Sequence, residues 1–286
     1  MRYNKVCMVY FDVETGGLER TCDILQIAMK YGDDVFNEYI NPTQKVNWMA
    51  TQLTGLSNVD GKLLLHGQRV QSYPLSRVIR DMLTYLRNFG RPCVLVAHNC
   101  FKFDAPRLIR AMRNAGVLRN ASALNKAGEI IDGFADTLPL FKKKFPGECI
   151  KLHHMAWRKL AYKLEETHDA LGNVYLLEEL TRCYLSEEQV STSWKSLPAA
   201  LERFWNNERV AAVVRTLQPL NGFVSQNTMT SLAEAGINYD LLVSTYRRDG
   251  EQAAISLIQE TVNGKPTGIK KQKVANQILD YLQMYN

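Results

Sequence analysis

The sequence predicts an α/β protein, in which helices flank a mixed five-stranded sheet and an all-helical C-terminal extension follows. The first observation is a series of short apolar segments, rich in β-branched and aromatic residues, which predict strands. The second is their order: early strands follow one another directly, whereas later strands alternate with helices, which mixes antiparallel with parallel pairing. The third is a change after about residue 190, beyond which only helical periodicity remains.

The strands predicted from composition occupy residues 5–14, 23–32, 33–42, 91–98 and the start of 128–145. Asp33 and Asp34 separate the second strand from the third and suit a hairpin turn. The flanking helices are predicted at 75–89, 105–116, the end of 128–145, 152–164 and 169–185. In the first helix Val78, Met82, Leu83 and Leu86 share one face, which is typical of a helix packed on a sheet.

The domain boundary is predicted near residue 190, within 186–194, which divides the chain into 1–190 and 191–286. The second part predicts helices at 197–217, 225–236, 239–248, 251–262 and 270–282. Because no low-complexity linker joins the two parts, we expect the helices to pack on the α/β part.

Composition sets only broad limits on function. The 286 residues are 46% hydrophobic and 22% charged, as in soluble globular enzymes, and no apolar run is long enough to cross a membrane. The net charge of +6 suits a polyanionic partner but equally a basic protein without one. The first residues predict a strand rather than a signal peptide. The 6 cysteines form no CxxC pair, which predicts free buried thiols and a nuclear or cytoplasmic location.

The first candidate site is Asp12 and Glu14 in FDVETGGL. Residues two apart on a strand point to the same side, so both carboxylates face one place. Paired carboxylates repel one another unless a cation lies between them, and hard oxygen ligands suit Mg²⁺ or Mn²⁺. The glycines that follow permit close backbone approach to a ligand. Two solvated acids at a strand end are the alternative.

The second candidate site is LVAHNCFKFDAPRL, where a strand runs into a loop and then a helix. Asp104 precedes the helix, so it suits either a ligand role or an ordinary N-cap. His98 and Asn99 are equally compatible with hydrogen-bonded turn residues. The third candidate is His168, followed five residues later by Asn173 in THDALGNV. By itself this histidine suits a surface or capping position.

Taken in order, these stretches resemble the DEDDh exonucleases, the DnaQ-like enzymes of the RNase H-like fold. The resemblance rests on FDVETGGL, LTGLS at 53–57, LVAHNxxxFDxPxL and HDALxxV, and covers about residues 5–185. Among these enzymes the chain is most similar to the three-prime repair exonucleases. The resemblance implies a 3′→5′ exonuclease that uses two Mg²⁺ or Mn²⁺ ions to release mononucleotides from DNA 3′ ends.

The resemblance also implies residue roles. Asp12, Glu14, Asp104 and the residue at 173 would hold the ions, and His168 would accept the proton of the attacking water. The substrate-binding residues implied in the same way are Thr15, Gly16, Gly17, Leu18, His98 and Asn99. Leu18 would wedge beside the terminal base, and Asn99 would support the ligands from behind.

Asn173 departs from the family pattern, which has an aspartate there. An amide oxygen can ligate a cation but brings no charge, so retention of two ions is in question. Three explanations compete: an engineered Asp→Asn substitution, which we favour because the other motif residues are intact; natural loss of activity; and replacement by Asp169. We expect Asp169 to cap its helix instead.

The helical part carries a second, looser resemblance. Residues 216–250 resemble the C-terminal region of the longest isoform of PML, the nuclear-body protein, and so PML-exon-9-like exonucleases. This gives an alternative function, a catalytically silent nucleic-acid-binding or interaction module. Basic residues at 265–273 suit phosphate contacts or a solvated helix end. Expected partners are DNA 3′ ends, single-stranded or frayed, with RNA as an alternative substrate; no membrane; and a homodimer, common in this branch.

Overall fold

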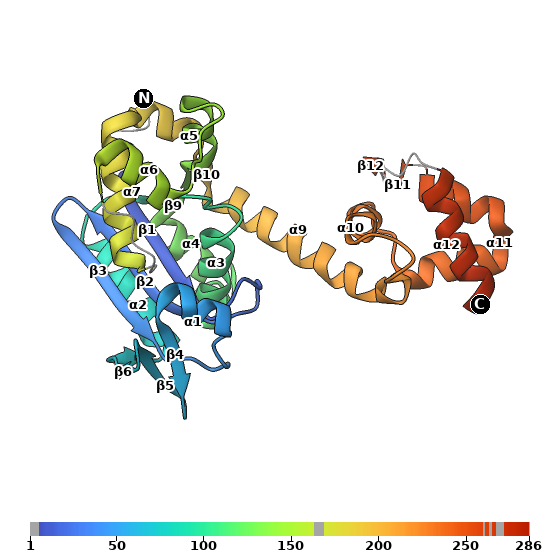
Figure 1. The fold of residues 1–286 in the computed structure, drawn as a ribbon, viewed down its shortest axis with the longest axis horizontal. Coiled ribbons are helices and arrows are strands. Elements are labelled where there is room, and N and C mark those ends of the chain that lie inside the picture. The colour runs from blue at the N-terminus through green and yellow to red at the C-terminus, as the bar shows by residue number, and fades with distance from the viewer. Residues whose placement is uncertain (1–5, 163–168, 260, 263–264, 267–271, 286) are drawn as a thin grey trace. The chain divides into compact units, whose positions relative to one another are not determined.

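The computed structural model describes residues 6–162, 169–259, 261–262, 265–266 and 272–285 (Figure 1). The chain divides into two compact units, Met1–Leu201 and Glu202–Asn286, and the division falls within helix α9 (Leu197–Thr216). The domain ranges expected from the sequence, with a boundary at residue 190, stay a prediction. Within the described residues, no helix is long and apolar enough to cross a membrane.

The first unit is built on a mixed sheet with the strand order β10-β9-β8-β1-β2-β3-β7. Its long strands are β1 (Cys7–Thr15), β2 (Ile24–Tyr31), β3 (Asp34–Ile40), β8 (Cys93–Ala97) and β9 (Ile131–Asp136). These are the predicted five, and they confirm the fold class. The two-residue strands β7 (Ser72–Tyr73) and β10 (Lys195–Ser196) extend the edges. Strand β1 is central, antiparallel to β2 and parallel to β8.

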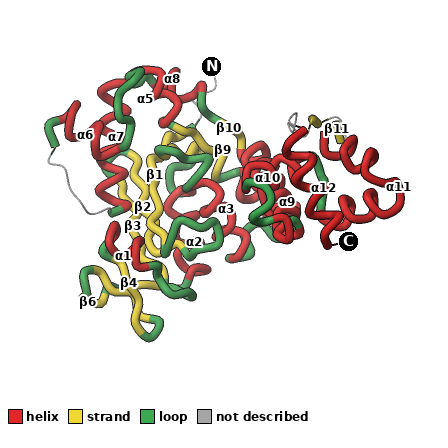
Figure 2. The backbone as a smooth tube through the Cα atoms, turned by 45° about the vertical axis from the view of Figure 1, so that its right-hand side comes forward, coloured by secondary structure: helices red, strands yellow, loops and turns green. Residues whose placement is uncertain are grey.

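Helices cover both faces of this sheet, which Figures 1 and 2 show from two directions. Helix α7 (Ala170–Tyr184) packs on β1 and β2 and on helix α6 (Leu152–Leu160). Helices α2 (Leu75–Arg87) and α3 (Asp104–Asn114) contact β3 and β2 and each other. Along β1, Val9, Phe11 and Val13 are fully buried, whereas Tyr10 alternates with them and packs toward α7. This alternation directs the even-numbered side chains of β1 toward α7.

Residues 48–69 contain elements that the sequence prediction omitted. They form α1 (Trp48–Thr54) and a small sheet of β4 (Leu56–Val59), β5 (Lys62–Leu65) and β6 (Gln68–Arg69). Asp60 and Gly61 both have positive φ angles, as the two-residue turn of a tight hairpin requires. The Asp-Gly pair is a strong hairpin signal, so this hairpin was predictable. Short helices α4 (Ala121–Gly128), α5 (Leu138–Lys144) and α8 (Glu187–Thr192) complete the unit.

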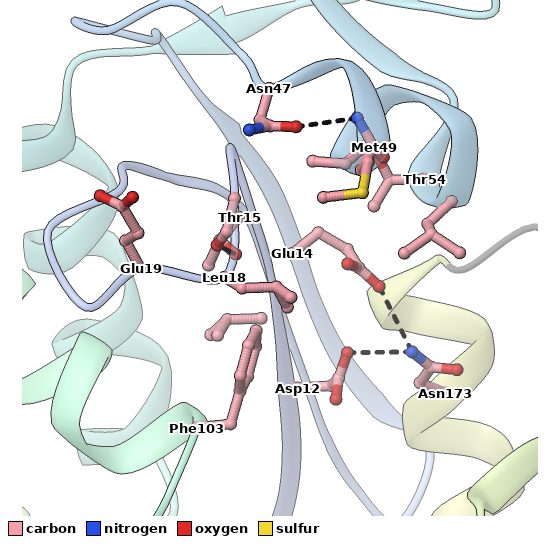
Figure 3. Close-up of a pocket in the computed structure, with 14 residues that line it drawn as sticks. Asp12, Glu14, Thr15, Leu18, Glu19, Asn47, Met49, Thr54, Phe103 and Asn173 are labelled. Atoms are coloured by element: carbon pink, nitrogen blue, oxygen red, sulfur yellow. Dashed lines mark hydrogen bonds between the residues drawn. The ribbon is translucent and has the colours of Figure 1, made fainter. Parts of the chain in front are cut away.

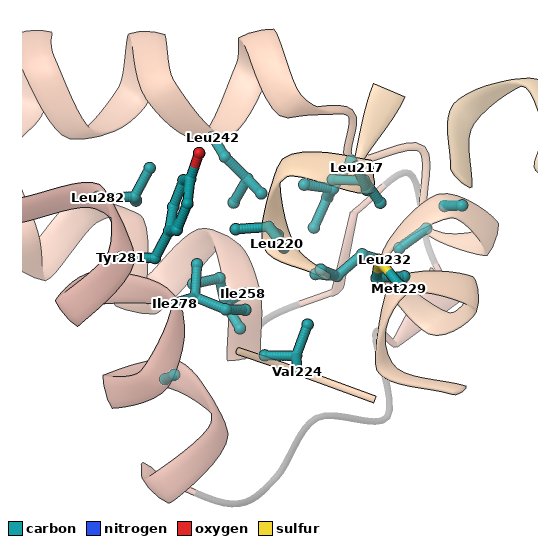
Figure 4. Packing of buried hydrophobic residues seen from close by; sticks show 14 of the residues in the cluster. Leu217, Leu220, Val224, Met229, Leu232, Leu242, Ile258, Ile278, Tyr281 and Leu282 are labelled. Carbon is teal, nitrogen blue, oxygen red and sulfur yellow. The ribbon is translucent and has the colours of Figure 1, made fainter. Parts of the chain in front are cut away.

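The second unit is helical and has its own core. It contains most of α9, the 3₁₀ turn η2 (Gln218–Leu220), α10 (Gln226–Glu234), α11 (Tyr239–Gln259) and α12 (Gln272–Tyr285). Two short strands, β11 (Thr261–Val262) and β12 (Lys265–Pro266), pair with each other. Figure 4 shows the core, in which Leu217, Leu220, Met229, Leu232, Ile258, Ile278 and Leu282 are buried. Gly250, with φ 81° and ψ −177°, interrupts α11 between the two helices predicted there.

The cysteines are free, as predicted, but not all are buried. Cys7, Cys93 and Cys100 lie in the core, whereas Cys149 and Cys183 are exposed. The expectation of uniformly buried thiols was therefore wrong.

Candidate active site

Three carboxylates and one amide meet where β1 ends. Asp12 and Glu14 project from β1 toward α7, and Asn173 projects from α7 toward them (Figure 3). Asp104 begins α3 and is close enough to Asp12 and Glu14 for their charges to raise its pKa. The β1–β2 register shifts between Glu14 and Thr15, a local irregularity of the kind often found beside functional sites. The fold thus brings together residues that are up to 161 positions apart in the chain.

A cavity of about 440 Å³ is lined by Asp12, Glu14 and Asn173 of this cluster. Asp12, Glu14 and Asn173 lie at its polar end (Figure 3). Its apolar lining includes Leu18, Met49, Ala50, Leu53 and Phe103. Leu18 is 76% exposed, so its side chain stands free at the cavity instead of packing in the core. An apolar pocket with convergent charges at one end suits a ligand that has a flat apolar part and a polar part.

Asn173 links the two carboxylates of β1. Its Nδ2 donates to Asp12 Oδ2 at 3.1 Å and to Glu14 Oε1 at 3.3 Å. Its Oδ1 lies 2.7 Å from Nε2 of His153, a residue of α6. The amide nitrogen, not the carbonyl oxygen, therefore faces the carboxylates.

The carboxylates bind protons more tightly than ordinary acids. Burial raises the pKa of Asp12 to about 7, although hydrogen bonding to Asn173 opposes the shift. Burial, then the charges of Asp12 and Asp169, raise the pKa of Glu14 to about 9. Burial and the charge of Asp12 likewise raise the pKa of Asp104. Their negative charges are therefore costly here, and a bound cation would offset that cost.

These shifts predict that the metal-free protein loses stability as pH rises. A carboxyl whose folded pKa is raised binds its proton more tightly when folded, so stability falls between the unfolded pKa, near 4, and the folded pKa. For Asp12 and Glu14 that window extends to about 7 and about 9. We expect urea denaturation in EDTA to give a free energy of unfolding lower at pH 9 than at pH 5 by on the order of 1–3 kcal/mol.

The matched control for this pH dependence is Glu14→Gln, which removes one titrating group at constant size. Its stability should fall less between pH 5 and pH 9 than that of the unchanged chain. Equal slopes for the two proteins would contradict a raised Glu14 pKa.

Asp104 does not act as an ordinary helix cap. Helix α3 begins at Asp104 itself, and its capping position is Phe103, whose side chain makes no capping hydrogen bond. Asp104 is 1% exposed, and its Oδ1 has no hydrogen-bond partner. A buried carboxylate oxygen without a donor is costly, and a divalent cation is one partner that would satisfy it.

The oxygen atoms of Asp12, Glu14 and Asp104 are of the kind that binds a hard divalent cation. Within the described residues, no three His, Cys, Asp or Glu side chains already converge as metal ligands. The amide nitrogen of Asn173 bonds to Asp12 and Glu14. The buried oxygens and the free Oδ1 of Asp104 are the features that fit a cation.

Asp169 caps α7, as expected, and its hydrogen bonds are those of a capping residue. Its Oδ2 accepts the backbone N–H of Gly172 at 2.9 Å, and its Oδ1 accepts Nε2 of Gln26 at 2.8 Å. Gln26 also donates to Asn37 and accepts the N–H of Ala170. With both oxygens engaged, Asp169 serves to fix the start of α7 on strand β2.

Arg107 fixes the loop that carries Leu18. This α3 residue is 3% exposed, and its guanidinium donates to the carbonyl oxygens of Leu18 and Glu19 and to that of Phe103. It also stacks on the Phe103 ring, 3.8 Å from the ring centroid. Arg107 therefore joins the backbone at Leu18 to the backbone at Phe103, and both residues line the pocket.

Replacing Arg107 should disturb the loop that carries Leu18 more than the carboxylates Asp12 and Glu14. We expect Arg107→Met, which keeps the stem but not the donors, to raise KM for a 3′-terminated oligonucleotide by roughly tenfold, with a smaller change in kcat. The loss of hydrogen bonds to two loop carbonyls is the cause. Steady-state kinetics would measure both constants. The control is Arg77→Met, a change at an exposed arginine of α2. A fall in kcat alone would contradict this role.

His98 and Asn99 lie outside the set of residues that line the pocket. The two ring nitrogens of His98 contact Thr137 Oγ1 at 3.0 Å and the carbonyl of Ile150 at 2.8 Å. Burial lowers the pKa of His98, so the neutral ring is favoured. The backbone N–H of Asn99 donates to Asp136. The substrate-binding role of this pair stays a prediction, and their contacts are those of loop residues.

The remaining predicted residues are placed as follows. Thr15, Gly17 and Leu18 line the pocket, and Gly16 lies between them in the chain. A Cβ on Gly17 would meet Cys22 Sγ at 2.9 Å, so a larger residue there would require the Cys22 side chain to move. His168 and much of the basic segment at 265–273 lie outside the described residues, so their roles stay predictions.

Several site residues were not predicted. Gln26, Arg107 and His153 contact the site from β2, α3 and α6. A polar residue within an apolar strand, ILQIAM, was the available signal for Gln26. Met49 and Leu53 share a face of α1, which was itself missed. Nothing in the local sequence distinguished His153 from its neighbour His154.

Comparisons with known proteins bear on the family and on the fold. No family model matches the chain. It is 26% identical over 292 residues to a PolC-type DNA polymerase III of Latilactobacillus sakei subsp. sakei (strain 23K), covering 97% of this chain and 18% of that protein. It is 30% identical over 196 residues to the PolC-type enzyme of Lactococcus lactis subsp. lactis (strain IL1403), covering 66% and 11%. The chain thus spans less than a fifth of either relative.

Solved structures of Exonuclease I are similar in fold. One covers 79% of this chain and 50% of its own, with a TM-score of 0.50 and 12% identity. Another, Escherichia coli Exonuclease I in complex with a dT13 oligonucleotide, covers 63% and 42%, with a TM-score of 0.49 and 13% identity. By its relatives and its fold, the chain is similar to the DnaQ-like 3′→5′ exonucleases of the RNase H-like fold, as its motifs predicted.

Proposed function

We propose that this protein is a metal-dependent 3′→5′ exonuclease that releases mononucleotides from DNA 3′ ends, and that Asn173 weakens its activity. The observation that carries the proposal is the pair Asp12 and Glu14 at the end of an apolar cavity, with the buried Asp104 close enough for their charges to raise its pKa. Buried carboxylates that gain from a cation suit metal-assisted hydrolysis of a phosphodiester.

The proposed cofactor is two Mg²⁺ or Mn²⁺ ions held by Asp12, Glu14 and Asp104, with residue 173 beside them. Bound there, such ions supply an activated water and stabilise the leaving 3′ oxygen. His168, which directly precedes Asp169 in the sequence, would accept the proton of that water.

The apolar part of the cavity suits the terminal nucleotide. Leu18, Met49, Leu53 and Phe103 offer an apolar surface to a base, while the carboxylates lie near its phosphate. DNA is the proposed substrate because the curated relatives are DNA polymerases. RNA is the alternative substrate. The expected oligomeric state is a homodimer, and the expected location is the nucleus or the cytoplasm.

A turnover assay tests this proposal directly. End-labelled DNA and RNA oligonucleotides of one sequence would be incubated with the protein and Mg²⁺, and the released mononucleotides counted. We expect slow, EDTA-sensitive release from the 3′ end, faster on DNA. Internal cleavage, or release that EDTA does not stop, would contradict the proposal.

A catalytically silent nucleic-acid-binding module, of the type suggested by the PML resemblance, is the second candidate. The bonds from Asn173 to Asp12 and Glu14 favour it, because they partly satisfy both carboxylates without a metal ion. Tight binding of a 3′-terminated strand without turnover, in both the unchanged chain and Asn173→Asp, would support this candidate.

A further inference from the structure

The side-chain amide of Asn173 lies between groups of opposite hydrogen-bonding character. On one side Nδ2 donates to the carboxylates of Asp12 and Glu14, at 3.1 and 3.3 Å. On the other side Oδ1 lies 2.7 Å from Nε2 of His153. His153 is brought there by the packing of α6 on α7. The amide is therefore held at both ends.

These contacts fix which end of the amide faces the carboxylates. An amide oxygen only accepts hydrogen bonds, so Nε2 of His153 must donate its N–H. Turning the amide by 180° would place Oδ1 against Asp12 and Glu14, acceptor against acceptor. It would also place the NH₂ group against Nε2 of His153, which is donor against donor in the tautomer that bonds to Oδ1 now. The ionised carboxylates and this tautomer of His153 therefore both oppose the turned state.

We propose that His153 is a positioning residue that keeps the amide nitrogen of Asn173 toward Asp12 and Glu14. In this arrangement Asn173 serves as a built-in hydrogen-bond donor to the two carboxylates and opposes a divalent cation on its side of the site. The inference rests on the proposed function in assuming that these carboxylates bind a cation. It gives Asn173 a role different from the ligand role implied by the family resemblance.

The inference predicts effects of opposite sign in two backgrounds. With Asn173 in place, removing His153 frees the amide to turn its oxygen toward a cation. The affinity of the site for a divalent cation should therefore rise. In Asn173→Asp both oxygens accept, and the N–H of His153 instead orients a ligating carboxylate from behind. In the Asn173→Asp background, removing His153 should therefore weaken cation binding. General damage to α6 would weaken binding in both backgrounds.

The first test is Mn²⁺ binding, followed by electron paramagnetic resonance of the free ion. The proteins are the unchanged chain, Asn173→Asp, and each of these with His153→Ala. His154→Ala is the matched control, because it removes the neighbouring histidine of α6, whose Nδ1 has no partner. We expect His153→Ala to tighten Mn²⁺ binding about tenfold beside Asn173, and to weaken it about tenfold beside the aspartate. Unchanged affinity, or the same sign in both, would overturn the inference.

The second test needs no metal. In EDTA, the side-chain NH₂ protons of Asn173 should exchange slowly with solvent by NMR, because two carboxylates hold them. We expect exchange at least tenfold faster in His153→Ala and unchanged in His154→Ala. Equal protection in His153→Ala would overturn the role of His153. If no variant binds Mn²⁺ while this difference is observed, the proposed function fails and the positioning role stands.

Discussion

Asn173→Asp is expected to raise turnover of a 3′-terminated DNA strand by about two orders of magnitude or more, the scale on which one electrostatic group at a reacting centre acts. The present site has three acids and an amide whose nitrogen faces Asp12 and Glu14. Replacing the amide adds a negative charge and removes the donor that competes with a cation. Substrate affinity should change much less, because Leu18 and the apolar cavity are untouched.

Single-turnover and steady-state rates with Mg²⁺, measured together with the Kd for the strand, separate these effects. Asn227→Asp in the exposed first turn of α10 is a control for the change of charge alone. Equal rates for the unchanged chain and for Asn173→Asp would show that the fourth acid is dispensable. Asp169, whose charge already acts on Asp12 and Glu14, would then be the first residue to test as its replacement.

The sequence was sufficient to predict the five long strands of the sheet and to place Asp12 and Glu14 on one face of β1. Apolar strands such as 91–98 are long and distinct, and DxE on a strand places both acids on one face. Helix α1 was not predicted because it has only 7 residues, too few to show a clear helical periodicity. Its clearest signals are its caps, Asn47 and Gly55. The Asp-Gly hairpin that follows was a signal that was overlooked.

The supporting residues were not predictable in the same way. Arg107 and His153 act through contacts with segments 89 and 20 residues away in the chain. Such pairs arise from tertiary packing, and neither residue stands at a motif position. His98 illustrates the converse: a motif position drew attention to it, yet Thr137 and Ile150 hold both ring nitrogens. A local pattern fixes the position of a residue in the strand or loop but not its partners.

Asp104→Asn, made in the Asn173→Asp background, is expected to abolish cleavage and yet to stabilise the metal-free fold. Asp104 is 1% exposed, one of its oxygens has no partner, and Asp12 and Glu14 add like charges nearby. Neutralising it at constant size removes that repulsion, so the free energy of unfolding in EDTA at pH 8 should rise by about 1 kcal/mol or more. Cleavage should fall by at least about 10³-fold, because a cation loses a charged ligand.

Asp136→Asn is the matched control. Asp136 is also buried, and it ends strand β9, which pairs with β8. Its carboxylate accepts backbone N–H groups of Asn99, Phe101 and Leu138, so its charge is used within the fold. Neutralising it should lower stability by about 1–3 kcal/mol and weaken cleavage only through that loss. Denaturant unfolding in EDTA and turnover in Mg²⁺ would measure both quantities. If Asp104→Asn destabilised the fold as Asp136→Asn does, Asp104 would be a structural acid, and a metal site built on it would have to be abandoned.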